Sequence, residues 1–448
     1  MLKKNEEYIV KIIDTGFEGE GIAKIDGAVI FIPGAIIGEE VKIKILKVTS
    51  SCCYAKVLEI ISKSEFRKES DCNTYPRYGG CNLRHIDYQK TIEMKKQSVE
   101  VTLKKALKRD IKVVEAISME NPLYYINKLQ YPIGVDESGE PVMGVFAQRT
   151  HKIIPTNNCK IQNLKCQEIA NDIFEFAKQN KIPAYNEQTL KGILRHLVIR
   201  IGVKTNEIMV TLVVNDLKIP KEKELVEYIA SKYSEVKTIV KNLNNQNTNV
   251  ILGNKCETIY GNGYIFDYLG DKKFKISPLS FYQVNPIQTK KLYDKAKEYI
   301  GSANILFDLY CGIGTIGIYC SDIASKVYGI EIVSQAIDNA RENAKINNVE
   351  NIEFLVGKAE DKIDELYNKN ILADTVLVDP PRKGLDKKLI DTLLEKEPNK
   401  IVYISCNNAT LARDLKMLEE KYELKECTLV DMFPHTSHVE CVAALKLK

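Results

Sequence analysis

The chain lacks an uninterrupted apolar segment long enough to cross a bilayer, and its first residues, MLKKNEEYIV, lack the apolar run of a signal peptide. We therefore expect a cytoplasmic protein with no membrane partner. Low-complexity tracts are also absent, and 44% hydrophobic and 28% charged residues are typical of a chain that folds. The net charge of +4 is small, so overall charge gives little support for a nucleic-acid partner.

Twelve cysteines are present without any sign of secretion, so structural disulfides are not expected. In a cytoplasmic chain, cysteines serve as core residues, metal ligands or reactive thiols. At 448 residues the chain exceeds the size at which one hydrophobic core keeps growing, which predicts two or three domains.

Three patterns divide the chain and predict a multidomain α/β protein. Residues 1–62 form short alternating runs such as YIVKIID and EEVKIKIL between glycine-rich turns, which predicts a small antiparallel β-barrel. Such barrels include oligonucleotide-binding ones and others without a ligand. Residues 63–280 mix strands and helices and predict a mixed α+β central domain. In residues 281–448, strands alternate with helices, which predicts a doubly wound, Rossmann-like parallel sheet.

One stretch of the central segment is strongly basic. Apolar residues recur there at helical spacing, so a helix with a basic face is predicted. This face is either a solvated surface or an RNA contact, and the sequence leaves both interpretations open. The apolar positions are Ile92, Val99, Leu103 and Leu107, and the lysines are Lys90, Lys95, Lys96, Lys104, Lys105 and Lys108.

A glycine-containing loop, Asp308-Leu-Tyr-Cys-Gly-Ile-Gly-Thr315, follows the first strand of the C-terminal pattern. Its glycines allow a tight turn beneath a ligand, and Glu331 ends the next strand, where a carboxylate accepts hydrogen bonds from ribose hydroxyls. The loop departs from both GxGxxG and the phosphate-binding GxxxxGK[ST] pattern. We therefore predict an adenosyl cofactor that has a ribose and a sulfonium but no phosphates.

The fourth strand ends in Val378-Asp379-Pro380-Pro381-Arg382, where two prolines stiffen a loop at the predicted crevice. Asp379 is expected to face that crevice. Amino-group methyltransferases place an aromatic residue after such a DPP run to stack the target base. Arg382 stands there instead, which counts against methylation of an adenine or glutamine amino group.

The next strand ends in a thiol, Cys406, at the same predicted rim. Addition of a thiolate to carbon 6 of uracil would make carbon 5 nucleophilic enough to attack a sulfonium methyl group. A base must then remove the proton on carbon 5, and Glu440 is the candidate. His435 and His438 flank it and are the alternatives, although orientation of neighbours or RNA contact suits both of them better.

The segments DLYCGIGTIG, VDPPRKG, ISCN and FPHTSHVE together resemble the RNA uracil-5-methyltransferase family, especially its ribosomal branch. The resemblance covers nearly the whole chain. The N-terminal barrel is similar to the TRAM domain of that branch, and FKISPLSFYQVN is similar to the family's cofactor-contacting segment. It implies an RNA-binding TRAM barrel, an RNA-binding central domain and a C-terminal class I methyltransferase domain.

The resemblance also implies roles for individual residues. Cys406 attacks carbon 6 of the uracil and Glu440 removes the proton. The target uridine flips out of its stack, and Arg195 and Arg200 either help to hold the RNA or are structural. The residues implied to bind the methyl donor, S-adenosylmethionine, are Gln283, Tyr310, Glu331 and Asp379.

The barrel favours 23S rRNA as the substrate, because the branch that acts on the T-loop of transfer RNA resembles this chain only from the central domain onward. Alternatives are a transfer RNA uracil-5-methyltransferase, methylation of another base or of a ribosomal protein, and a non-catalytic RNA-binding assembly factor. The last two leave the paired Cys406 and Glu440 unexplained. We expect a monomer with no obligate protein partner.

Ribosomal members commonly hold an iron-sulfur cluster with four cysteines, the first three in a run C-x5-C-G-G-C. Cys72, Cys81 and Cys159 match three of the four positions, but Tyr78 occupies the second. Cys52 or Cys53 could supply the missing thiolate. The resemblance therefore names a [4Fe-4S] cluster as a second cofactor without deciding whether it is bound.

Overall fold

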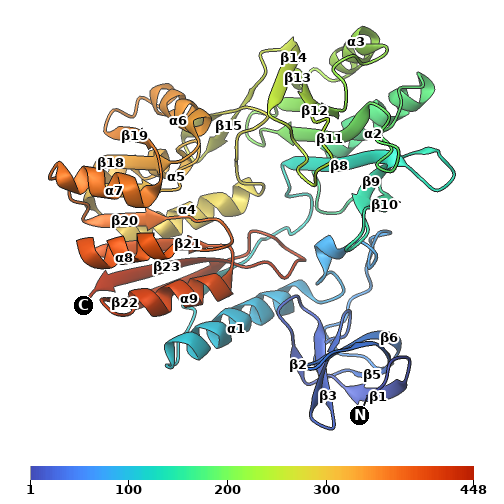
Figure 1. Ribbon diagram of the computed structural model, residues 1–448, viewed down its shortest axis with the longest axis horizontal. Helices are drawn as coiled ribbons and strands as arrows, with labels where there is room; N and C mark the ends of the chain where they lie inside the picture. The colour runs from blue at the N-terminus through green and yellow to red at the C-terminus, as the bar shows by residue number, and fades with distance from the viewer. Residues whose placement is uncertain (1) are drawn as a thin grey trace.

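The computed structural model describes residues 2–448, and the N-terminal part is a six-stranded sheet in the order β1-β5-β6-β4-β3-β2 (Figure 1). The two long strands, β5 and β6, shift register at three points, and such bulges make a sheet curl. Its inner face is apolar, with Ile30 and Ile43 fully buried. The strands are β1 (Glu7–Lys11), β2 (Asp14–Thr15), β3 (Gly21–Ile25), β4 (Ala28–Ile32), β5 (Glu40–Val48) and β6 (Cys53–Ser62).

The central part contains a seven-stranded sheet in the order β10-β9-β8-β11-β12-β13-β14. Helices α2 and α3 pack against it, and alternate residues of its strands, such as Leu129 and Ile199, fill the core between them. The strands are β8 (Lys128–Val135), β9 (Pro141–Phe146), β10 (Ile153–Pro155), β11 (Leu194–Ile201), β12 (Ile208–Val214), β13 (Val236–Leu243) and β14 (Lys255–Gly261), and the helices are α2 (Leu164–Gln179) and α3 (Glu222–Lys232).

The C-terminal part is built on an eight-stranded sheet in the order β19-β18-β17-β20-β21-β23-β22-β7. Strands β17 to β21 are parallel, as predicted, and β23 inserts antiparallel between β21 and β22. The order reverses between β17 and β20, the point where such sheets open a ligand crevice. The strands are β17 (Ala303–Leu309), β18 (Ala324–Glu331), β19 (Ile352–Val356), β20 (Thr375–Val378), β21 (Lys400–Ser405), β22 (Tyr422–Val430) and β23 (Glu440–Leu447).

Helices cover both faces of this sheet, and a hairpin of β15 and β16 leads into it (Figure 1). Asn343 of α6 ties the hairpin to the loop after β17, because its side chain accepts from the amide of Lys275 at 2.8 Å and donates to the carbonyl of Ile313 at 3.2 Å. The elements are β15 (Ile265–Leu269), β16 (Lys272–Ile276), α4 (Pro286–Ile300), α5 (Thr315–Tyr319), α6 (Ser334–Ile346), α7 (Ala359–Asn368), α8 (Lys387–Lys396) and α9 (Asn408–Leu418), with short 3-10 turns at Gly79–Cys81 and Ser321–Ile323.

Residues 88–117 pack with the C-terminal part, although the sequence places them in the central segment 63–280. Helix α1 (Tyr88–Leu107) lies along α9, with Val99 and Leu103 in the core beneath the large sheet (Figure 1). Strand β7 (Glu115–Ile117) then extends that sheet by pairing with β22. The apolar stripe that predicted the helix is therefore the surface that attaches it to the C-terminal part.

The basic face of α1 is only partly a surface. Lys104 and Lys105 are exposed, as expected for a solvated face, but Lys95 is buried. Within residues 2–448, none of the helices is both long and apolar enough to cross a membrane.

Candidate active site

Four of the predicted site residues meet at the carboxyl ends of neighbouring parallel strands. Tyr310 directly follows β17, Glu331 ends β18, Asp379 directly follows β20 and Cys406 directly follows β21. The end of β20 is joined to that of β17 by a long hydrogen bond of 3.5 Å from the amide of Asp379 to the carbonyl of Leu309. These residues thus surround the crevice at the reversal of strand order.

The loop after β17 turns through left-handed backbone conformations. Tyr310 has φ 66°, and Gly314 has φ 79°. A side chain on Gly314 would also collide, because its Cβ would lie 2.8 Å from Cζ of Phe354. The buried Asp308 anchors the turn by accepting the amide of Gly317 at 2.9 Å, and burial raises its pKa to about 8.

Glu331 faces this loop. Its carboxylate accepts the amide of Gly312 at 3.3 Å and the amide of Val333 at 2.9 Å. The next two residues, Ile332 and Val333, are exposed apolar side chains. The loop sequence from Asp308 to Gly317 contains no lysine or arginine. A carboxylate beside an apolar surface suits the hydroxyls of a ribose and the flat face of an adenine, and its negative charge would repel a phosphate placed against it.

Gln283 lies on the segment between β16 and α4, where it is half-buried. This segment is fastened to the central sheet by Asn127, whose side chain donates to the carbonyl of Gln283 at 3.1 Å. The amide of Asn127 donates to the carbonyl of Val284 at 2.9 Å. At its end, the buried Asn285 caps α4 and donates to the carbonyl of Met432 at 2.9 Å. The central domain therefore helps to position this side of the site.

Cys406 and Glu440 are brought together by strand pairing. Ser405 on β21 is the partner of Cys441 on β23, so the next residues along this antiparallel register are Cys406 and Glu440. Cys406 is half-buried and Glu440 is buried. They are 34 positions apart in the sequence, and the pairing of β23 with β21 brings them to one rim.

The electrostatics of this pair are dominated by burial. Burial, together with the charges of Glu440 and Asp379, raises the pKa of the Cys406 thiol to about 11, and the cation of Arg382 opposes this. Burial likewise raises the pKa of Asp379 to about 7, and burial and Asp379 raise that of Glu440 well above its ordinary value. Cys406 also precedes Asn407, the cap of α9, and a helix N-terminus favours a thiolate.

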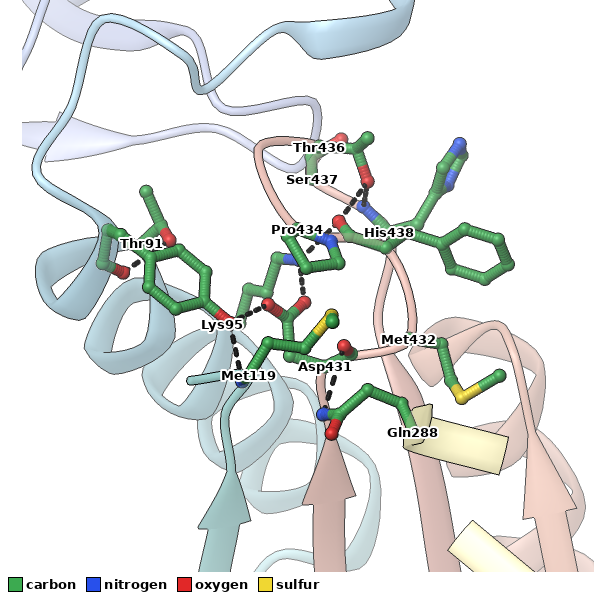
Figure 2. A network of polar contacts seen from close by, with 12 residues as sticks. Thr91, Lys95, Met119, Gln288, Asp431, Met432, Pro434, Thr436, Ser437 and His438 are labelled. Atoms are coloured by element: carbon green, nitrogen blue, oxygen red, sulfur yellow. Dashed lines mark hydrogen bonds and ion pairs between the residues drawn. The ribbon is translucent and has the colours of Figure 1, made fainter. Parts of the chain in front are cut away.

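Helix α1 holds one side of the turn that leads into Glu440, as Figure 2 shows. Lys95 donates to the carboxylate of Asp431 at 2.5 Å and to the carbonyl of Phe433 at 3.1 Å. The hydroxyl of Tyr88 donates to the other oxygen of Asp431 at 2.8 Å and accepts the amide of Met119 at 2.8 Å. Lys95 is thus a structural cation in the support of the turn, whereas its lysine run predicted a surface position.

The segment that precedes α1 also holds this turn, through Asn82 and Leu83. The side chain of Asn82 accepts the amide of Ser437 at 2.9 Å and donates to its hydroxyl at 2.9 Å. Asn82 also donates to the carbonyl of Glu18, on a turn of the N-terminal barrel. The carbonyl of His435 accepts the amide of Leu83 at 3.0 Å. Barrel, cysteine loop and catalytic turn are therefore in direct contact.

His435 and His438 lie on this turn in different surroundings. His435 is buried with φ 66°, and burial lowers its pKa to about 4, so it is neutral. His438 is exposed at the rim, edge-on to Phe433 with ring centroids 5.8 Å apart. Of the two, His438 is the one that solvent reaches.

The two arginines of β11 also differ. Arg195 lies over the ring of Tyr185, 4.3 Å from its centroid, and donates to the carbonyls of Asn244 and Gln246. It is a structural residue of the central sheet. Arg200 is buried, and its Nη1 has no hydrogen-bond partner among the residues that the structure describes.

The cysteine loop does not fit an iron-sulfur cluster. Cys81 and Cys159 are buried, and burial with the neighbouring Cys159 and Cys72 thiols raises the pKa of Cys81 to about 12. The iron-sulfur pattern needs a fourth thiolate at position 78. Tyr78 stands there instead, and its aromatic ring lies against Gly80. Within residues 2–448, no group of three or more His, Cys, Asp or Glu side chains is placed to hold a metal ion. The expected ligand set of Cys72, Cys81 and Cys159 is therefore not supported.

Sequence reasoning missed the residues that support the site. Lys95, Asp431 and Asn82 have no motif of their own, because each acts through a partner more than 300 positions away along the chain. An acidic residue just before the FPHTSHVE segment and a lysine on the apolar side of a helix were the only signals. Neither signal identifies the other residue of the pair.

The fold and the rim define a class I methyltransferase with an added N-terminal barrel and a central α+β domain. The family model described as tRNA (Uracil-5-)-methyltransferase matches residues 87–448, and the TRAM domain model matches residues 2–58. The chain belongs to this family of S-adenosylmethionine-dependent RNA uracil-5-methyltransferases. The predicted fold class is thereby confirmed, and so is the family resemblance.

Similar proteins span the full length of the chain. An uncharacterized RNA methyltransferase of Clostridium acetobutylicum is 46% identical over 99% of this chain and 98% of its own. One from Bacillus cereus is 44% identical over 100% of this chain and 98% of its own. Among solved structures, the tRNA (uracil-54, C5)-methyltransferase of Pyrococcus abyssi, in complex with S-adenosyl-L-homocysteine, is 29% identical. That likeness has a TM-score of 0.79 and covers 98% of this chain and 100% of that one.

The Pyrococcus structure corrects one step of the sequence argument. A transfer RNA enzyme is similar to this chain over nearly its whole length, N-terminal part included. The barrel therefore does not by itself distinguish a ribosomal from a transfer RNA substrate.

Proposed function

We propose that this enzyme methylates carbon 5 of a uridine through a covalent bond between Cys406 and carbon 6, with Glu440 as the base. The observation that carries the proposal is the strand register, which sets Cys406 beside Glu440 at the rim that also holds Asp379. A thiol and a buried carboxyl at one rim suit addition followed by proton removal.

Gln283, Tyr310, Glu331 and Asp379 would hold S-adenosylmethionine, which supplies a methyl group bound to a positively charged sulfur. Glu331 would accept the two ribose hydroxyls once its bond to the amide of Gly312 is released. The exposed Ile332 would cover the adenine. The carboxyls of Asp379 and Glu440 lie near the crevice, and the positive charge of a bound donor would favour their ionised forms.

In the covalent route, Cys406 acts as the nucleophile and Glu440 as the base. The thiolate of Cys406 forms a bond to carbon 6 of the uracil, and the displaced π electrons make carbon 5 nucleophilic. Carbon 5 takes the methyl group, and the bond from that group to sulfur breaks. The carboxylate of Glu440 then removes the proton from carbon 5, the double bond re-forms, and the thiolate of Cys406 leaves.

Cys406 must lose its proton before it attacks. With its pKa raised to about 11, the free enzyme holds mostly the thiol at neutral pH. Arg382 and the N-terminus of α9 both favour the thiolate, and the RNA closes the site over it. Arg382 follows the two prolines, and its carbonyl accepts the hydroxyl of Thr410 in the first turn of α9 at 3.2 Å, which holds it on this rim.

For the substrate, we propose 23S rRNA, bound in the cytoplasm by a monomer. The support is the likeness of the cysteine loop, with Cys72, Cys81 and Cys159, to that of the ribosomal branch. A transfer RNA is the second candidate, and the observation that favours it is the full-length similarity to a tRNA (uracil-54, C5)-methyltransferase.

The test uses RNA in which 5-fluorouridine replaces uridine. Fluorine cannot leave carbon 5 as a cation, so the covalent adduct accumulates and migrates slowly on a denaturing gel. The protein is mixed with S-adenosylmethionine and either 23S rRNA fragments or transfer RNA, with Cys406→Ala as the control. A band with rRNA that is missing in Cys406→Ala supports the proposal. A band with transfer RNA alone moves the substrate to the second candidate, and no band with either RNA overturns the covalent route.

A further inference from the structure

Two cations stand opposite each other on the central sheet. Lys128 on β8 and Arg200 on β11 are direct partners in the antiparallel register. Their strand neighbours Leu129 and Ile199 belong to the core beneath α2, so Lys128 and Arg200 point to the other face of the sheet. Like charges directly opposite one another destabilise a sheet.

That face of the sheet is turned toward the catalytic half. Met209 on β12 is the other partner of Arg200, and it packs into the same core as Tyr282 from the segment after β16. Asn127, which directly precedes Lys128, holds the carbonyls of Gln283 and Val284. The two cations therefore lie beside the segment that carries Gln283, between the central sheet and the candidate active site.

Among residues 2–448, neither Lys128 nor Arg200 forms an ion pair or a side-chain hydrogen bond, although Arg200 is only 3% exposed. Two buried lysines of this chain are neutralised: Lys95 pairs with Asp431, and Lys241 lies between two glutamates. The nearby Asp267 accepts the amide of Lys204 at 2.8 Å, and it does not bind Arg200.

This arrangement is costly for the free protein. Burial, together with the charge of Arg200, lowers the pKa of Lys128 to about 8, and burial lowers that of Arg200 to about 10. A buried charge without a partner opposes folding unless an opposite charge is supplied by a ligand. A planar guanidinium beside an ammonium suits the oxygens of a phosphate.

We propose that Lys128 and Arg200 form an anion site that binds a backbone phosphate of the RNA next to the target uridine. The inference rests on the proposed function, since it needs an RNA at the catalytic rim. A uridine that leaves its stack to reach Cys406 must have its backbone held close by. The segment that carries Gln283 joins the pair of cations to the candidate active site. The site would thus position the nucleotide without reading its base.

An anion of the same chemistry, the carboxylate of the methyl donor, is the alternative source, and binding measurements separate the two. The variants are Lys128→Met, Arg200→Met and Arg200→Lys. The control is Lys387→Met, which removes an exposed cation that pairs with Asp391 on α8. Affinity for a labelled 23S rRNA fragment and for a transfer RNA is measured over a range of salt concentrations, and S-adenosylmethionine binding is measured without RNA.

We expect Lys128→Met and Arg200→Met each to weaken RNA binding about tenfold and to lower the slope of log affinity against log salt by about 1. Arg200→Lys should keep the slope, because it keeps the charge. Donor affinity should stay unchanged, as should every value for Lys387→Met. Arg200→Met should melt no lower than the parent, since an unpaired buried charge is removed, and Lys128→Met should not melt lower because it removes an unpaired, half-buried charge.

An unchanged salt slope in Lys128→Met overturns the proposal, and this half-buried position keeps the test open if Arg200→Met fails to fold. A loss of donor affinity without a change in RNA binding assigns the anion to the donor and also overturns it. The covalent adduct test is independent. An adduct with unchanged slopes leaves the proposed function standing without this site, and changed slopes without any adduct leave the site standing without the covalent route.

Discussion

The ammonium of Lys95 lies 2.5 Å from a carboxylate oxygen of Asp431, and both side chains are buried. The pair joins α1 to the residue that directly follows β22, so it fixes the start of the turn that leads to Glu440. Helix α1 thereby helps to position Glu440, a candidate catalytic residue far along the chain. Breaking the pair should affect both stability and the geometry of the site.

We expect Lys95→Met to destabilise the protein by about 3–5 kcal/mol, because it leaves Asp431 charged and buried without a cation. The double variant Lys95→Met/Asp431→Asn should recover much of this loss, since an amide oxygen still accepts the hydroxyl of Tyr88. Denaturant unfolding of the three proteins measures the effect. A double variant no more stable than Lys95→Met would show that the pair is not the cause.

We predict that Glu440→Gln accumulates a covalent complex with ordinary, unfluorinated RNA. Addition by Cys406 and methyl transfer do not need the base, whereas elimination waits for removal of the carbon 5 proton. A denaturing gel with radiolabelled methyl donor detects the complex, and the double variant with Cys406→Ala is the control. Normal turnover by Glu440→Gln would exclude Glu440 as the base and return attention to His438.

Removal of the cation at Arg382 should shift the pH dependence of methylation. Arg382 lowers the pKa of Cys406, so Arg382→Ala raises that pKa further and reduces the thiolate at a given pH. We expect a rate roughly two- to tenfold lower at neutral pH and a rising limb displaced to higher pH. Single-turnover rates across pH measure this. Arg382→Lys should restore the profile, and Lys383→Ala, which removes the neighbouring exposed cation, should leave it in place.

Asp308 should make the protein less stable as pH rises. Its pKa is about 8 in the folded chain against 3.8 as the ordinary value, so the folded state holds the extra proton between these limits. Its stabilising contribution is therefore full below about pH 3.8 and is lost as pH rises toward 8. Asp308→Asn has no such titration and does not lose stability in this way. Its melting temperature relative to the parent should therefore increase by a few degrees between pH 5 and 8. A constant difference would contradict the buried, protonated state.

The cysteine loop predicts that the protein does not assemble an iron-sulfur cluster. Anaerobic reconstitution with iron and sulfide should leave iron content and visible absorbance at background. Tyr78→Cys completes the four-cysteine pattern with Cys72, Cys81 and Cys159, and we expect it to gain a cluster. Four irons bound to the unaltered chain would show that the loop rearranges around the metal.

Much of the catalytic half follows from the sequence alone. The alternation of strands and helices determines the parallel sheet, and Gly314 allows a left-handed turn where a side chain would collide with Phe354. A thiol at the end of one strand and acids at the ends of others follow from the same pattern, because parallel strands end at one edge. These signals are local, because each lies within one stretch of consecutive residues.

Only the tertiary structure decides which distant residues meet. The sequence contains Cys406 and Glu440, but the antiparallel insertion of β23 beside β21 places them together. The sequence places Lys95 on the apolar side of a helix, but it does not name Asp431 as its partner; that follows only when α1 packs against α9. In the same way, the register of β8 and β11 sets Lys128 opposite Arg200. Pairing energies depend on proximity and burial, and the sequence of a single segment specifies neither.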